Sequence, residues 1–394
     1  MRPTMESAEP YVSPQAFGGG RSPAASAPEV PPATVRHRTD SDKISGSSSE
    51  TIVVQISPIY PTGSFSTQEH FRELDGMRGV LAVTVMLFHF GLSTLFQRVS
   101  LGALPASNWG LCVDFFFLLS GFVLCRSYER RRVSFLEFAW RRSLRLFPLY
   151  LTGMFAALIC VQEKYDASVV ASNLVMAQGL FGAPSINFPA WSVPFEFYLP
   201  LTAIAAASVL GPMPRRVATA LFACAVAGGS VLCLLYETGS DHEFLRAAAG
   251  LSAGALLYGL WSRRKIARKS ASVAAFGIVG ALVIMMLSGL APSLSLLFYP
   301  CAIAAIWFGA EARGIFSLAG AQAIGRWSYS IYLLHIPVLA GYESITGQTL
   351  QGAAVTKALL ATAVIVIAGF SYRHLELPAI NFGRRHPMLF VRAP

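Results

Sequence analysis

From residue 78 onwards, the sequence is a succession of apolar blocks, each long enough to cross a lipid bilayer as a helix. Charged residues make up only 13% of the 394-residue chain, whereas roughly 25% is typical of soluble domains. The sequence therefore predicts an all-α integral membrane protein, a polytopic bundle of about ten transmembrane helices. The ten blocks cover residues 78–97, 110–126, 146–163, 191–210, 217–236, 244–261, 271–290, 292–309, 326–346 and 353–372. Almost no loop separates the seventh block from the eighth, so the count depends on that junction.

The basic residues of the loops predict how the bundle is oriented. With the N-terminus inside, the inner loops are 126–145, 211–216, 262–270 and 310–326, and together they hold 16 Lys and Arg residues. The outer loops contain Arg98 and Lys164, with Arg246 and Lys357 at span boundaries. Because positive residues concentrate in cytoplasmic loops, both termini are predicted to be cytoplasmic. Basic runs placed between apolar blocks are topology signals, so we expect no nucleic-acid partner.

The remaining segments predict two tails around one domain. Residues 1–70 are rich in Ser, Pro, Gly and Thr and are expected to form a disordered cytoplasmic tail. This stretch contains no apolar run typical of a cleavable signal peptide. The transmembrane domain is expected at 71–385, followed by a short tail at 386–394. The six cysteines show no CxxC spacing, so neither a disulfide framework nor a metal site is expected.

Four ionisable side chains fall inside the predicted spans: His89, Asp114, Glu196 and His335. Such residues are costly in a bilayer and usually face a partner or a water-filled cavity. We expect both histidines near the middle of their spans and both carboxylates about 6–7 Å inside the outer ends. A structural explanation also exists for each, since a histidine can donate to a backbone carbonyl and a carboxylate can link two helices.

Further charged residues gather at the predicted cytoplasmic mouth of the bundle. They are Asp75, Arg78, Arg141, Arg142, Arg145 and Glu376. His89 lies eleven positions after Arg78, which corresponds to roughly 16 Å along a helix and about 20° around it. The two side chains are therefore predicted on one helix face. An alternative for the arginines is a purely topogenic role, with side-chain stems that snorkel.

This combination of groups predicts a particular kind of chemistry. An imidazole beside a carboxylate commonly removes a proton from a substrate. Guanidinium groups pair bidentately with phosphate oxygens. We therefore expect a site that joins a phosphorylated cytosolic donor to an acceptor that approaches from outside.

Six sequence blocks resemble the acyltransferase-3 family of membrane O-acyltransferases. In order, they are FRELDGMRGVLAVTVMLFHF (71–90), VDFFFLLSGFVL (113–124), RRSLRLFPLY (141–150), AWSVPFEFYLPL (190–201), WSYSIYLLHIP (327–337) and YRHLELP (372–378). The resemblance covers about residues 70–385. The chain is similar to stand-alone members, because no SGNH esterase-like domain follows the tenth block.

The resemblance implies an activity and roles for individual residues. Members transfer acetyl or other short acyl groups from acyl-CoA, a co-substrate, to hydroxyls of envelope or exported carbohydrates and glycolipids, and they bind no cofactor. It implies His89 as the essential histidine, Arg78 as its basic companion, and Arg142 and Arg145 on the donor side. Glu196 matches the acidic residue of the family. The implied location is the bacterial cytoplasmic (inner) membrane, with several spans in the lipid bilayer.

Together these observations predict transfer of the acyl group within the membrane. We expect His89 to deprotonate a sugar hydroxyl, which attacks the thioester, while Asp114 or Glu196 orients the imidazole. A covalent acyl intermediate on His89 or Ser120 is the alternative route. The residues expected to support the site are Asp75, Ser120, Trp191, His335 and Glu376.

Two rival functions explain parts of the same pattern. A proton-coupled secondary transporter would use His89, Asp114 and Glu196 as a proton relay. A non-catalytic scaffold of an export complex would leave these intramembrane charges without a purpose. The sequence shows no internal repeat of the kind found in many transporters.

Overall fold

The computed structural model describes residues 71–91, 110–131, 134–161, 163–210, 213–239, 241–263, 277–278, 280, 292–347, 350 and 354–386. Helices and turns make up this part of the chain, and no strand occurs within it. The predicted all-α class is therefore confirmed for these residues. The tail predicted at 1–70, most of the seventh predicted span and residues 387–394 lie outside the described residues.

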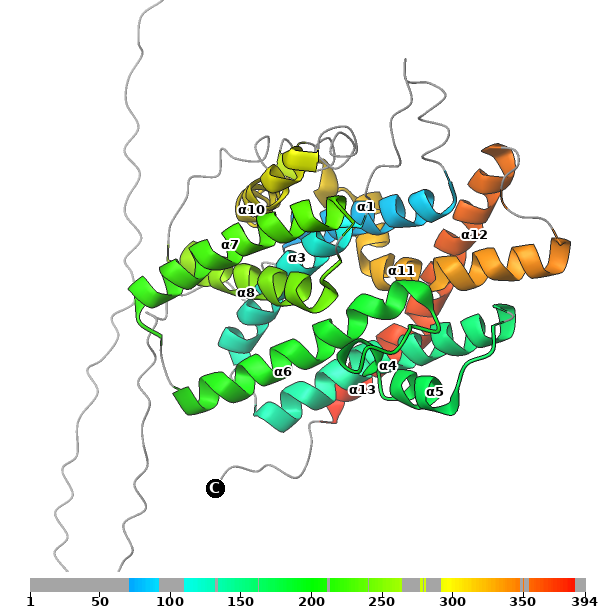
Figure 1. Ribbon diagram of the computed structural model, residues 1–394, viewed down its shortest axis with the longest axis horizontal. Coiled ribbons are helices and arrows are strands. Elements are labelled where there is room, and N and C mark those ends of the chain that lie inside the picture. Colours follow the sequence, from blue (N-terminus) through cyan, green and yellow to red (C-terminus); the bar gives the residue numbers. More distant parts are fainter. Residues whose placement is uncertain are drawn as a thin grey trace, which may run out of the picture. The chain divides into compact units, whose positions relative to one another are not determined.

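The helices follow one another in the order shown in Figure 1. They are α1 (Arg72–His89), α3 (Leu111–Arg131), α4 (Phe135–Cys160), α5 (Ala167–Leu174), η1 (Gln178–Leu180), η2 (Phe188–Ser192), α6 (Val193–Leu210), α7 (Arg215–Glu237), α8 (Glu243–Trp261), η3 (Pro292–Leu297), α10 (Phe298–Gly309), η4 (Ile315–Ser317), α11 (Ala319–Thr346), α12 (Ala354–Ser371), η5 (Tyr372–Glu376) and α13 (Leu377–Arg385). All short η segments are 3₁₀ turns except η5, which is a π-helix.

Six of these helical stretches are long and apolar enough to cross a membrane. They are Leu111–Arg130, Phe135–Cys160, Arg215–Glu237, Glu243–Trp261, Pro292–Gly309 and Ala354–Arg385. The chain is thus a helical membrane protein, while the count of about ten spans and the side on which the termini lie remain predictions.

The helix α4 begins eleven residues before the predicted span and includes most of a predicted inner loop. Its first turn is capped by Ser134, whose hydroxyl oxygen accepts a hydrogen bond from the backbone N–H of Glu137 at 3.3 Å. Ser-x-x-Glu is the sequence pattern of a capping box. Because α4 starts here, Arg142 and Arg145 are helical residues with fixed directions rather than loop charges.

Two other helix ends differ from the predicted spans. The first predicted span runs to residue 97, but α1 ends at His89, followed by Phe90 as the C-cap. Gly91 then adopts a positive φ of 68°, and its carbonyl accepts a hydrogen bond from Lys357 at 2.9 Å. His89 therefore lies at the end of a helix rather than in its middle. At the other end of the chain, α12 continues through η5 into α13 and ends at Arg385.

The packing of α1 against α11 is tight enough to bring the two backbones into contact. A Cβ atom at Gly79 would overlap the backbone of Gly325, and a Cβ at Gly325 would overlap the carbonyl of Asp75. Small residues allow such close approach between membrane helices. Side chains of α1 that flank this contact must therefore face α11.

The second close helix pair is α3 with α8, which lie side by side in Figure 1. A Cβ atom at Gly254 would overlap the carbonyl of Leu118 and approach the backbone N–H of Phe122. Large aromatic side chains, including Phe115, Phe117 and Phe122, are completely buried around this pair. This contact joins α8 to α3, and α3 also packs against α1.

The segment between α4 and α6, predicted as an outer loop, is folded into the bundle. Asn173 accepts from the backbone N–H of Ile186 at 3.1 Å and donates to the carbonyl of Pro184 at 2.9 Å. Further along, Asn187 donates to the carbonyl of Leu333 of α11 at 2.8 Å. These buried amides replace water as partners of the segment's backbone, so the chain enters the bundle before α6 begins.

We expect a methyl group at Gly254 to separate α3 from α8. Gly254→Ala should lower stability by about 1–3 kcal/mol, because the added carbon meets backbone atoms that cannot rotate away. The measurement is the melting temperature of the purified protein in detergent.

Gly259→Ala is the matched control on the same helix, since no described atom lies within 4 Å of a Cβ built there. It should leave stability unchanged or raise it by up to about 1 kcal/mol, as alanine favours helix. Equal melting temperatures for the two variants would contradict the tight α3–α8 contact.

Candidate active site

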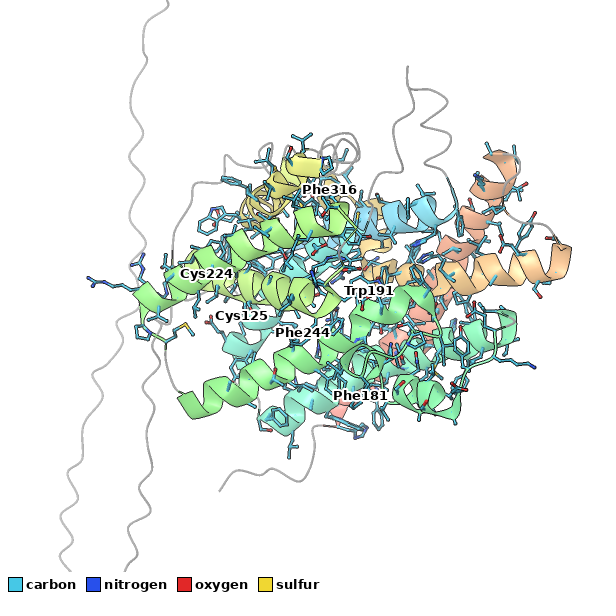
Figure 2. The ribbon with its side chains drawn as sticks, viewed as in Figure 1. Cys125, Phe181, Trp191, Cys224, Phe244 and Phe316 are labelled. Atoms are coloured by element: carbon cyan, nitrogen blue, oxygen red, sulfur yellow. The ribbon has the colours of Figure 1, made fainter. Side chains whose placement is uncertain are left out.

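The end of α1 borders a cavity of about 400 Å³. Its walls come from α1, from the folded segment before α6, from the turn between α7 and α8, and from α11. The lining includes His89, Phe188, Trp191, Tyr236, Asp241 and Tyr332. Trp191, labelled in Figure 2, packs between Phe117 of α3 and Phe195 of α6. The cavity thus combines an imidazole, aromatic rings and carboxylates in one place.

The imidazole of His89 contacts a second histidine. Its Nδ1 lies 3.0 Å from the carbonyl oxygen of Val85 and 3.0 Å from Nε2 of His335. The ring centroids of the two histidines are 4.9 Å apart, and the ring of Phe188 meets His89 edge-on at 5.9 Å. His335 itself is 0% exposed. The sequence predicted a carboxylate beside His89, but the structure places His335 there.

Asp114 is fully buried and belongs to a different arrangement. Its carboxylate lies 2.6 Å from a guanidinium nitrogen of Arg246, which is only 1% exposed. Arg246 also bonds to Asp241 at 2.9 Å and to the carbonyl of Gly110 at 3.2 Å. Its guanidinium stacks over Tyr236 at 4.0 Å. Asp114 therefore holds Arg246, which in turn contacts the cavity residues Tyr236 and Asp241. It does not orient His89, which corrects that part of the prediction.

Sequence reasoning missed Arg246, which it treated as a boundary charge of an outer loop. The signal was present, because Asp114 and Arg246 lie four and two residues inside the outer ends of two apolar blocks. Two opposite charges at similar depth in a helical bundle commonly pair, since an unpaired charge there would be costly.

Glu196 also has an arginine partner. Arg142 is 7% exposed, and it donates to the backbone carbonyl of Glu196 through Nε at 2.8 Å and through a terminal nitrogen. The carboxylate lies 3.8 Å from the same guanidinium. The Ser120 hydroxyl donates a hydrogen bond to this carboxylate. Glu196 was predicted about 7 Å inside the outer end of its span, near a histidine at mid-span. It lies instead among the arginines, because the chain has already entered the bundle where α6 begins.

Three arginines form a group that we call the arginine cluster: Arg78, Arg142 and Arg145. Arg78 donates to the Ser328 hydroxyl at 2.9 Å and to the Gly325 carbonyl at 3.2 Å, and it lies 3.4 Å from Asp75. The charge of Arg145 interacts with Arg78, Arg142, Glu196 and Glu376. Arg145 is exposed, whereas the other two guanidinium groups are largely committed to protein partners. Arg141, the neighbour of Arg142, pairs instead with Glu137 one turn earlier.

Glu376 joins this cluster from the far end of the chain. It lies on the π-helix η5, is 4% exposed, and accepts a hydrogen bond from Ser330 of α11. Single π turns inside α-helices often occur at functional sites. The extra residue per turn directs Glu376 towards α11 and the arginines.

The predicted common face of Arg78 and His89 is confirmed, since both side chains contact α11. Arg78 reaches Ser328 and His89 reaches His335, seven residues and thus about two turns further along α11. Tyr332 lies between these two contacts in sequence; its hydroxyl is 3.2 Å from that of Ser192, and its ring faces His335 at 6.2 Å.

The chain is similar to one protein family and to two curated proteins. Residues 71–373 match the family model of an acyltransferase domain, Acyl_transf_3. Acyltransferase MdmB of Streptomyces mycarofaciens is 28% identical over 181 residues, which are 42% of this chain and 46% of MdmB. Protein 2 in picA locus of Rhizobium radiobacter is 37% identical over 105 residues, which are 25% of this chain and 51% of that protein. The chain spans about half the length of these curated relatives. No solved structure matches it.

We expect Arg246→Met to destabilise the protein by about 3–5 kcal/mol, because Asp114 would remain buried without its counter-charge. The double variant Arg246→Met with Asp114→Leu should recover most of this loss. Melting temperatures in detergent provide the measurement. The half-exposed partner gives the control: Asp241→Asn should have a much smaller effect. A double variant as unstable as Arg246→Met alone would contradict a buried pair.

Proposed function

The chain belongs to the acyltransferase-3 family, whose model matches residues 71–373, and from this premise we propose the reaction that it catalyses. An acetyl or other short acyl group passes from cytosolic acyl-CoA to a hydroxyl of an envelope or exported carbohydrate. The enzyme resides in the bacterial cytoplasmic membrane, with the arginine cluster on the cytoplasmic side. The observation that carries this proposal is the position of His89, at the cavity, on the same helix face as Arg78.

The donor is expected to bind at the arginine cluster. Arg145 is exposed and provides a guanidinium for the phosphates of CoA, with Arg78 deeper along the path. Arg142 is occupied by Glu196, so it holds that residue in place rather than binding phosphate. From Arg78, roughly 16 Å along α1 leads to His89. The extended pantetheine arm of CoA suits a path of this kind, with its thioester at the inner end.

The acceptor is expected to enter the cavity beside His89. Trp191, Tyr236 and Tyr332 offer aromatic faces for a sugar ring, and Asp241 and Glu243 offer oxygens that accept from sugar hydroxyls. These two carboxylates also disfavour an anionic acceptor through like-charge repulsion. A neutral or amine-bearing sugar therefore fits the described walls best.

The proposed reaction moves one proton and one acyl group. His89 takes the proton of the acceptor hydroxyl while the oxygen attacks the thioester carbonyl. The carbon–sulfur bond breaks, and His89 returns the proton to the CoA thiolate. The products are an ester and free CoA. Ser120, the candidate for a covalent intermediate, lies beside Glu196 at the arginine cluster. Direct transfer needs only His89 as the base, so we favour it over a covalent route through Ser120.

The transporter alternative has less support from the geometry. A relay through His89, Asp114 and Glu196 requires these groups to exchange protons. Asp114 is bonded to Arg246 and Glu196 to Arg142. Each carboxylate is therefore neutralised by its own arginine.

The proposal is tested by measuring alkali-labile acetate in the envelope carbohydrate of a deletion strain. Complementation with the wild-type gene should restore the ester. His89→Gln at equal membrane abundance should reduce the initial rate of ester formation by about 10²-fold or more. His374→Gln is the control, because His374 is an exposed histidine that stacks on Phe370. Full restoration by His89→Gln would show that His89 is structural. No ester even with the wild-type gene would reject the proposed reaction.

Donor binding makes a separate prediction. Arg145→Gln should raise the KM for acetyl-CoA by about tenfold, as expected from the loss of one charge-assisted hydrogen bond, and should change kcat little. The assay is release of the CoA thiol by the purified enzyme. Arg215→Gln, an exposed arginine at the start of α7, serves as the control and should leave KM unchanged. An unchanged KM in Arg145→Gln would move the donor site elsewhere.

A further inference from the structure

Hydrogen positions in the pair of histidines follow from the partners of each nitrogen. Nδ1 of His335 lies 3.1 Å from the carbonyl oxygen of Ile331. A carbonyl oxygen can only accept, so Nδ1 of His335 must carry the hydrogen. In a neutral imidazole the other nitrogen then has a lone pair. Nε2 of His335 is therefore an acceptor, and it points at His89.

The same reasoning applies to His89. Its Nδ1 lies 3.0 Å from the carbonyl of Val85 and 3.0 Å from Nε2 of His335. Both of these neighbours are acceptors, so Nδ1 of His89 carries a hydrogen that the two share. Nε2 of His89 is left with the lone pair. This nitrogen is the one available to remove a proton from a substrate.

We propose that His335 is a positioning residue, which holds His89 in the tautomer with the free Nε2 and stabilises the imidazolium formed during transfer. This inference rests on the proposed role of His89 as the base. When His89 takes the hydroxyl proton on Nε2, its Nδ1–H becomes a stronger donor to His335. His335 keeps its own protonation state throughout, and the proton leaves on CoA.

A carboxylate has this role in the familiar Ser-His-Asp triad. The environment of His335 explains why an imidazole replaces it here. His335 is completely buried in α11, where an ionised carboxylate would need a counter-charge. Neutral imidazole offers the same lone pair without a charge. Asp114 and Glu196, which pair with Arg246 and Arg142, are therefore not needed to orient His89.

The tautomer can be read directly from the wild-type protein. Full-length enzyme with ¹⁵N-labelled histidine is reconstituted in lipid, and solid-state NMR distinguishes protonated from unprotonated ring nitrogens. The signal of His89 is assigned by its absence in His89→Gln. We expect a protonated Nδ1 and an unprotonated Nε2 for His89 at neutral pH. The opposite tautomer would overturn the proposal, whether or not the enzyme transfers acyl groups.

Two substitutions test the effect on the reaction. Glutamine at position 335 reaches as far as Nε2 of histidine and can present its amide oxygen to His89. Asparagine reaches only as far as Nδ1. The assay is CoA-thiol release from acetyl-CoA, with envelope carbohydrate extracted from the deletion strain as acceptor. His335→Gln should retain a rate within about tenfold of the wild type, whereas His335→Asn should lose about 10²-fold with an unchanged KM for acetyl-CoA.

The melting temperatures of both variants are also measured. If His335 were purely structural, its substitution would lower stability and rate together. Equal losses of rate in the two variants at equal stability would overturn the role of His335, as would a wild-type rate in His335→Asn. An inactive wild-type enzyme would reject the proposed function instead, and the NMR measurement would still decide the tautomer. The two failures are therefore distinguishable.

Discussion

The site depends on the close parallel contact of α1 with α11. Gly79 and Gly325 let the two backbones touch. The face of α1 that carries Arg78 and His89 therefore packs against α11. Ser328 and His335 meet these two side chains there. A wider separation would break both hydrogen bonds. Packing of small residues therefore positions both Arg78 and His89 against α11.

The charges of the described bundle are sorted by this packing. Asp114 and Arg246 tie α3 to α8, and Glu196 and Arg142 tie α6 to α4. Both pairs satisfy charges that would be costly alone in a membrane. His89 instead contacts a second imidazole, which fits its proposed role as a base that gains and loses a proton. Both ion pairs connect neighbouring helices, whereas the two imidazoles bond to each other and to backbone carbonyls.

Local sequence rules predicted much of this architecture, but contacts between distant residues escaped them. Hydropathy placed most of the helices, and the 3.6-residue period placed Arg78 and His89 on one face. Hydropathy alone starts the third span at residue 146, whereas the Ser-x-x-Glu pattern at Ser134 marks the true start of α4 at Phe135. The pairing of His89 with His335 joins residues 246 positions apart, and no periodicity within one helix carries that information. The π turn that directs Glu376 inward is equally invisible to a helical period.

The central claim is that donor and acceptor reach His89 from opposite sides of the membrane, and vesicle orientation tests it most directly. Inside-out vesicles from the source strain expose the cytoplasmic face and enclose the envelope carbohydrate. Radiolabelled acetyl-CoA added outside them should label the enclosed carbohydrate with an alkali-labile ester, and right-side-out vesicles should incorporate label only after permeabilisation. Equal labelling in intact vesicles of both orientations would contradict transfer across the membrane.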